Sequence, residues 1–110
     1  MRSYLIDEIS YPDMKKIDEF LKENAIKSDL EKIFWVKIPE DILNEIQFQH
    51  HNCQPYFFAL ELGQDWIKLE FFLRNLKNFK CECSGYCTNQ QRDFILEYAQ
   101  GMIKELGIKT

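Results

Sequence analysis

The sequence has little glycine and proline, with four Gly and three Pro among 110 residues. Because these residues mark turns and loops, their scarcity predicts a chain built mostly of regular helices and strands. Long apolar runs are also lacking, since no stretch approaches the ~18 residues that a membrane-spanning helix needs. Asp7 and Glu8 precede any apolar run, so we expect no signal peptide and a cytoplasmic location.

Excess positive charge is lacking as well. The formal net charge is −4 and the pI is about 5.2, and no run of Lys or Arg occurs. Nucleic-acid-binding modules depend on cationic faces that neutralise phosphates, so we expect no nucleic-acid partner and no membrane partner. The chain also lacks a glycine-rich phosphate loop, an H-E-x-x-H motif and a nucleophile elbow, which argues against the commonest enzyme classes.

Hydrophobic residues, in contrast, make up 45% of the chain, which is enough for the core of a single domain spanning residues 1–110. The order of expected elements is β-α-β-α-β-β-β-α. It predicts an α+β fold with a single, mainly antiparallel sheet and helices packed mostly on one face. Periodicity and punctuation predict strands over 3–9, 33–38, 56–62, 65–74 and 79–84, with helices over 12–26, 39–50 and between Thr88 and Gly107.

Two elements carry the strongest local signals. The dipeptide Gly63-Gln64 is typical of a two-residue hairpin loop, which pairs Leu62 with Asp65 and Leu60 with Ile67. The last helix has a capping box at its start and a glycine where a left-handed residue ends a helix. The expected hairpin gives one continuous apolar face, made of Tyr56, Phe58, Leu60, Leu62, Ile67, Leu69, Phe71 and Leu73.

The opposite face of the hairpin carries three aromatic side chains, Phe57, Trp66 and Phe72. Three aromatic residues are too many for a face that lies wholly in water, so either another element covers them or they bind a partner. We therefore expect a protein partner or self-association through this face. The acidic and basic residues between them are typical of cross-strand charge pairs.

Cysteine and histidine form two groups that predict a metal site. Thiolates and imidazoles are the preferred ligands of Zn²⁺, which makes zinc the candidate cofactor. Neither group contains the C-x-x-C spacing that marks zinc knuckles. The candidate ligands are His50, His51 and Cys53 in the first group, and Cys81, Cys83 and Cys87 in the second.

The expected strand order works against this site. In a plain meander, Cys53 and Cys81 lie two strand spacings apart, or roughly 10 Å. Thiolates that share one zinc ion lie within about 4 Å of each other. The site therefore requires either a bent segment at 50–54 or a strand order in which strands 56–62 and 79–84 are neighbours. The alternative is that the thiols are structural, since buried cysteine often acts as a small hydrophobe.

Cys87 has a separate interpretation because it immediately precedes the cap of the last helix. The helix dipole at that end lowers the pKa of a thiol and favours the thiolate. With His50 or His51 nearby, Cys87 is the one candidate for a catalytic or redox-sensing nucleophile.

Three functions follow from these residues. We favour a small interaction or regulatory module that associates through the aromatic face. The first alternative is a zinc-binding protein that uses Cys81, Cys83 and Cys87 with Cys53 or a histidine as the fourth ligand. The second is a thiol enzyme or redox sensor centred on Cys87.

Overall fold

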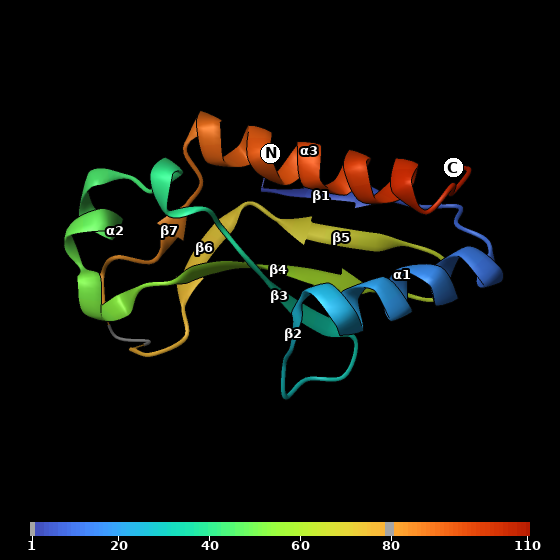
Figure 1. Ribbon diagram of the computed structural model, residues 1–110, viewed down its shortest axis with the longest axis horizontal. Coiled ribbons are helices and arrows are strands. Elements are labelled where there is room, and N and C mark those ends of the chain that lie inside the picture. Colours follow the sequence, from blue (N-terminus) through green and yellow to red (C-terminus); the bar gives the residue numbers. More distant parts are fainter. Residues whose placement is uncertain (1, 79–80) are drawn as a thin grey trace.

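The computed structural model describes residues 2–78 and 81–110. It has a single antiparallel sheet, with two long helices packed against the same face, as Figure 1 shows. This arrangement confirms the predicted α+β fold. The strands lie in the order β1-β5-β4-β3-β2, and β6 pairs with both β4 and β7.

The elements have the following bounds. The strands are β1 (Ser3–Ile6), β2 (Ile26–Lys27), β3 (Ile33–Lys37), β4 (Tyr56–Leu62), β5 (Ile67–Glu70), β6 (Phe72–Asn75) and β7 (Gly85–Tyr86). The α-helices are α1 (Tyr11–Asn24), α2 (Glu45–Gln49) and α3 (Asn89–Glu105), and the short 3₁₀ helices are η1 (Glu40–Ile42) and η2 (His51–Cys53).

Helix α3 forms as its local sequence predicts. The side chains of Thr88 and Gln91 make the reciprocal capping box at its start. At its end, Gly107 adopts φ +66°, and the N–H groups of Gly107 and Ile108 donate to earlier carbonyls of the helix. These bonds satisfy donors and acceptors that a helix end otherwise leaves unpaired.

One hydrophobic core lies between the sheet and the helices α1 and α3. Every apolar residue expected on the inner face of the hairpin is buried, from Tyr56 to Leu73. The helices contribute apolar side chains at helical spacing, which removes them from water and stabilises the fold. These helix residues are Met14, Ile17 and Leu21 from α1, and Ile95, Ala99, Met102 and Ile103 from α3.

The hairpin register differs from the prediction by two residues. Leu62 pairs with Ile67 rather than Asp65, and Leu60 pairs with Leu69. The loop is longer than expected because the Gly63 N–H donates to the Trp66 carbonyl at 2.8 Å, while the Asp65 carbonyl accepts the Ile9 N–H. A shift of two residues keeps each side chain on its expected face, so the core was predicted correctly although the register was wrong.

The helix expected over 39–50 is divided into η1 and α2. Asn44 stops the first turn and begins the second helix, since it forms a capping box with Gln47. The Gln47 side chain then accepts a hydrogen bond from Gln91 of α3 at 2.9 Å, and both glutamines are fully buried. This buried amide pair holds α2 against the start of α3.

The strand expected over 65–74 breaks at Phe71. The Phe71 N–H donates to the Arg2 carbonyl, and the Phe71 carbonyl accepts the Cys87 N–H. Phe58 and Ala59 of β4 consequently lie opposite residues 70–73, which leaves two extra residues in the partner strand. Beyond this bulge, β6 pairs with the beginning of β4, where Tyr56 lies opposite Asn75.

The strand expected over 79–84 is not found where it can be described. Residues 79 and 80 lie outside the described residues, and Cys81–Ser84 form a turn. Gly85, expected to end that strand, instead begins β7, which pairs with β6. The alternating pattern was misleading because the Cys81 N–H donates to the Asn78 carbonyl at 3.2 Å, which closes a local turn.

A glycine substitution tests the hairpin loop. A Cβ atom added at Gly63 would overlap the Trp66 ring, whereas one added at Gly101 of α3 meets no atom within 4 Å. We expect Gly63→Ala to lower the free energy of unfolding by about 1–3 kcal/mol, because the ring must move. Gly101→Ala is the matched control and should raise it by about 0.5–1 kcal/mol. Urea unfolding of both variants measures this difference, and equal effects would contradict the described loop.

Candidate metal centre

Three of the four cysteines lie together at one end of the sheet. The Sγ atoms of Cys53, Cys81 and Cys83 all lie within 4.8 Å of one another. Cys53 ends η2, while the other two belong to the connection between β6 and β7, near α2 in Figure 1. Because thiolates on one zinc ion lie within about 4 Å of each other, small side-chain rotations suffice to bring these sulfurs to ligating distance.

The fold meets the first of the two conditions that the sequence set for this cluster, the bent segment at 50–54, whereas Cys81–Ser84 form a turn rather than a strand beside β4. The segment before β4 is bent into η2, where the Cys53 N–H donates to the His50 carbonyl at 2.9 Å. In addition, β6 is the neighbour of the start of β4, so the β6–β7 connection begins beside Tyr56. The distance of roughly 10 Å expected for a plain meander therefore does not apply.

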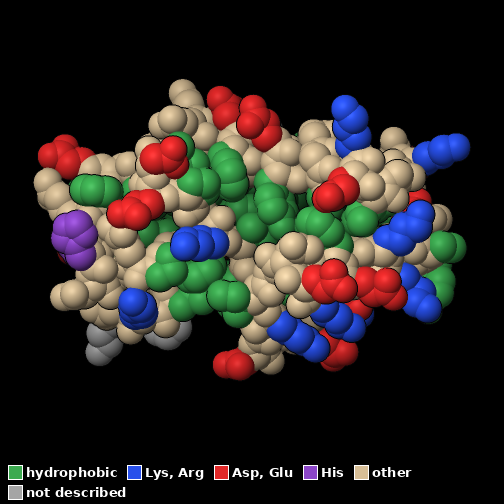
Figure 2. Space-filling model, in the orientation of Figure 1, with side chains coloured by type: hydrophobic (Ala, Val, Ile, Leu, Met, Phe, Trp, Pro, Cys, Tyr) green, Lys and Arg blue, Asp and Glu red, His purple; other side chains and the backbone are tan. Residues whose placement is uncertain are grey.

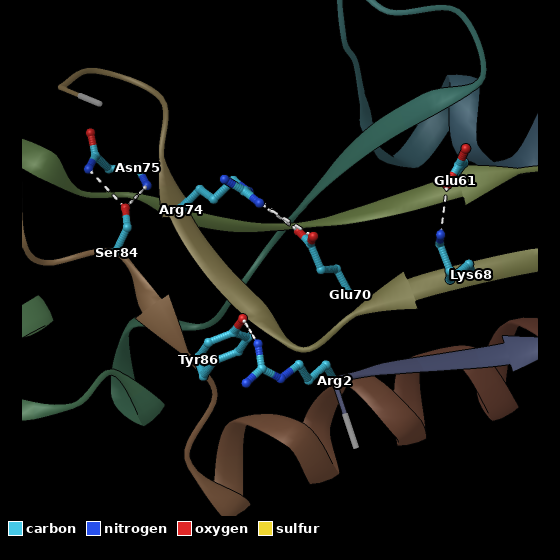
Figure 3. Close-up of polar contacts among 8 residues, drawn as sticks. All are labelled: Arg2, Glu61, Lys68, Glu70, Arg74, Asn75, Ser84 and Tyr86. Carbon is cyan, nitrogen blue, oxygen red and sulfur yellow. Dashed lines mark hydrogen bonds and ion pairs between the residues drawn. The ribbon is translucent and has the colours of Figure 1, made fainter. Parts of the chain in front are cut away.

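Asn75 organises the second half of the cluster. Its side chain is buried, and its Oδ1 atom accepts the backbone N–H groups of Lys77 and Asn78 at 3.1 and 2.5 Å. Its Nδ2 atom lies 3.4 Å from Cys83 Sγ and donates to Ser84 Oγ at 3.3 Å, the contact drawn in Figure 3. Sequence reasoning missed this residue, although an asparagine at the end of a strand is typical of such a turn.

Tyr56 is a second residue that sequence reasoning missed. Its side chain is fully buried, and among the described residues its hydroxyl has no hydrogen-bond partner. Burial raises its pKa, and the neighbouring Cys83 thiol raises the pKa further, so the hydroxyl stays protonated. A buried hydroxyl without a partner lowers the stability of a fold by about 1–3 kcal/mol. The Tyr56 hydroxyl therefore destabilises the protein unless it finds an acceptor.

The three thiols differ in how readily they ionise. Burial raises the pKa of Cys53 to about 12, and the thiols of Cys83 and Cys81 raise it as well. In contrast, the pKa of Cys81 is lowered, mainly because the Cys83 backbone N–H donates to its sulfur. A cation placed among them would favour all three thiolates, since opposite charge stabilises the ionised form.

The two histidines lie in different surroundings. The charge of His50 contributes to the lowered pKa of Cys81. The Nδ1 atom of His50 lies 2.6 Å from the Ile46 carbonyl oxygen. That hydrogen bond places a proton on Nδ1. Neither His50 nor His51 belongs to the group of ligand atoms that lie within 4.8 Å of one another. His51 instead packs its ring edge-on against Phe48. Figure 2 shows a histidine at the surface at this end of the molecule.

Cys87 lies apart from the other three thiols. It precedes α3 as expected, but its pKa is raised to about 11, so the predicted lowering is wrong. Burial is the main cause, the Glu70 carboxylate adds to it, and Arg92 opposes it. The field of the helix N-terminus favours the thiolate, but the half-buried thiol loses hydration, and this loss outweighs the effect of the dipole.

The aromatic residues expected to form an interface do not form one patch. Phe57 is only 6% exposed, and Trp66 is half-buried against the hairpin loop. Phe72 lies under the Arg74 guanidinium. Its ring also packs edge-on against the Tyr86 ring, with 5.0 Å between the ring centroids. Self-association through these three residues stays a prediction.

Charged side chains share this face of the sheet, as Figure 3 shows. Lys68 of β5 pairs with Glu61 of β4 at 3.4 Å, which confirms one expected cross-strand charge pair. Arg74 instead pairs at 3.2 Å with Glu70, four residues earlier in the chain. They line a hollow of about 400 Å³ whose floor includes Ala59. Exposed pairs of this kind contribute little to stability, about 0–1 kcal/mol each.

Comparison with protein-family models, with curated proteins and with solved structures found no significant match. Among residues 2–78 and 81–110, no helix has the length and apolar character needed to cross a membrane. The function must therefore be inferred from the site.

Alkaline unfolding tests the environment of Cys87. Between about pH 9 and 11 the folded chain keeps this proton and the unfolded chain loses it, so the free energy of unfolding falls as the pH rises. In Cys87→Ser that fall should be smaller than in the unchanged protein. Urea unfolding under reducing conditions at pH 8 and pH 10.5 measures it. The same pH dependence in both proteins would contradict the burial of this thiol.

Proposed function

We propose that this protein binds one Zn²⁺ ion through the thiolates of Cys53, Cys81 and Cys83. The observation that carries the proposal is the convergence of these three sulfurs within 4.8 Å, from segments almost thirty residues apart in the chain. The metal would tie η2 to the β6–β7 connection at the end of the sheet.

The donor set favours zinc over other metals. Three thiolates are soft ligands, which suit Zn²⁺ better than Mg²⁺ or Ca²⁺. An iron–sulfur cluster uses four cysteines, and Cys87 is not part of this group. The double positive charge of Zn²⁺ also offsets the burial and the neighbouring thiols, which together raise the pKa of Cys53.

His50 is the proposed fourth ligand. Zinc in structural sites takes four protein ligands, and the Cys₃His set is one of the common combinations. The Nδ1 contact with the Ile46 carbonyl gives this ring the tautomer of a metal ligand. The alternative, His51, is engaged with Phe48.

Two buried donors support the thiolates from outside the ligand set. Asn75 Nδ2 lies within hydrogen-bonding distance of Cys83 Sγ, and the Tyr56 hydroxyl is unpaired beside the same thiol. Hydrogen bonds to the sulfurs stabilise their charge when the metal is bound. The Tyr56 hydroxyl then gains the acceptor that it otherwise lacks.

The proposed role of the metal is structural. Four protein ligands close the coordination sphere and leave no position for a substrate. A reducing setting would keep the thiols of Cys53, Cys81 and Cys83 free to bind the metal.

Metal analysis of the purified, reduced protein tests the proposal. We expect one zinc ion per chain, and Co²⁺ substitution should give the intense visible bands of a tetrahedral thiolate site. Replacing Cys53, Cys81 or Cys83 with Ser should weaken binding by more than about 100-fold, beyond the 10–100-fold typical of residues that only support a ligand.

Neighbouring residues provide matched controls. His50→Ala should weaken zinc binding by about 10–100-fold, whereas His51→Ala and Cys87→Ser should leave the affinity unchanged. Less than one zinc ion in ten chains, with all four thiols titrating freely in the native protein, would overturn the proposal. Equal losses for His50→Ala and His51→Ala would overturn the choice of the fourth ligand.

A pair of tyrosine variants separates support of the metal from ordinary packing. Tyr56 and Tyr98 both have a buried hydroxyl without a partner among the described residues. Removing either hydroxyl should raise the stability of the metal-free protein by up to about 1 kcal/mol. Only Tyr56→Phe should weaken zinc binding, by about 10-fold. Zinc titration and urea unfolding of both variants measure these effects, and equal zinc affinity in the two would rule out the Tyr56 hydroxyl as a donor to the site.

A further inference from the structure

We infer that the thiol cluster is a peroxide-sensitive switch, in which oxidation joins Cys81 to Cys53 and expels the metal. This inference rests on the proposed zinc site and concerns its regulation. It depends on the unequal exposure of three thiols that lie close enough to react with one another.

Exposure decides which thiol meets an oxidant first. Cys81 is half-buried and lies in the turn that follows β6, so part of its side chain faces solvent. Cys53 and Cys83 are only 5% and 3% exposed. A small polar oxidant therefore reaches Cys81 before the other two, since thiol oxidation follows access and thiolate character.

The position of each remaining cysteine in the chain then determines which thiol forms a disulfide with Cys81. Cys53 comes from a different segment, and its Sγ atom lies within 4.8 Å of Cys81 Sγ. A disulfide needs the two sulfurs at about 2 Å with suitably oriented Cβ atoms, which side-chain rotation can achieve across two facing segments. Cys83 is separated from Cys81 by a single residue, and Asn75 holds its sulfur.

The chemistry balances with hydrogen peroxide as the oxidant. The Cys81 thiolate attacks one peroxide oxygen, forming a sulfenic acid, and the other oxygen leaves as hydroxide and takes up a proton to become water. The Cys53 thiolate then attacks the Cys81 sulfur, the S–S bond forms as the S–O bond breaks, and the hydroxide that leaves takes up a proton from solvent to become a second water. Two thiolates are oxidised by two electrons, one peroxide is reduced, and Zn²⁺ leaves with its charge unchanged.

The switch is reversible by a dithiol reductant, which restores both thiolates by thiol–disulfide exchange. Cys83 and His50 alone would hold zinc weakly once two of the four ligands are lost. Cys87 lies outside the cluster and serves as an internal reference for non-specific oxidation.

The test follows zinc and disulfides in the same sample. Zinc-loaded, reduced protein is treated with stoichiometric hydrogen peroxide in the presence of a chromogenic zinc chelator, and the products are mapped by peptide mass spectrometry. We expect one zinc ion released per Cys53–Cys81 disulfide, and recovery of zinc binding after reduction. Cys87→Ser, the matched control, should release zinc at the same rate.

The outcomes separate this inference from the proposed function. Full zinc loading that survives peroxide, or a disulfide that joins Cys83 to either partner, overturns the switch and leaves the zinc site intact. Release that slows by half or more in Cys87→Ser also overturns it, because the oxidant would then act first outside the cluster. Failure to load zinc before any oxidant is added overturns both proposals at the first step.

Discussion

The pairing of Tyr56 with Asn75 is the contact on which both the sheet and the thiol cluster depend. This pairing exists only because the strand is interrupted at Phe71, after which β6 pairs with β4 in a register shifted by two residues from that of β5. The same pairing brings the β6–β7 connection alongside η2. Asn75 therefore has two roles, since its backbone completes the strand ladder and its buried amide holds the turn that carries Cys83. An unpaired amide in that position would be costly, so the turn and the strand stabilise each other.

The parts of the fold that the sequence predicted are those with local signals. The inner face of the hairpin follows from alternation alone, and α3 follows from its capping box and Gly107. The break at Phe71 was missed because its backbone partners, Arg2 and Cys87, lie far away in the sequence. The hairpin register failed for a related reason, since Ile9 bonds to a residue that the shorter loop would have placed in the strand.

The candidate site shows the same division. Composition identified the thiols and the histidines as a possible zinc set, but spacing could not show which of them meet. The structure groups Cys53 with Cys81 and Cys83 and leaves Cys87 apart. The reactivity predicted for Cys87 rested on one local effect, the helix dipole, and burial outweighed it. Asn75 and Tyr56 carried no signal as site residues, because their importance depends on burial beside a thiol.

The thiol cluster lies at one end of a core that extends over the whole sheet, which limits what a metal can do here. The core consists mainly of apolar residues of the sheet, α1 and α3, with Cys53 and Cys83 among its buried members. A chain of this size with such a core does not need a metal to fold. Zinc binding would instead stabilise one end of the molecule, where the Gln47–Gln91 pair joins α2 to α3 and the Asn75 amide contacts Cys83 of the β6–β7 connection. The free energy of binding would act on that end alone. Gain or loss of the ion would then change the order of this end while the remaining sheet stays folded, which is the property a local switch requires.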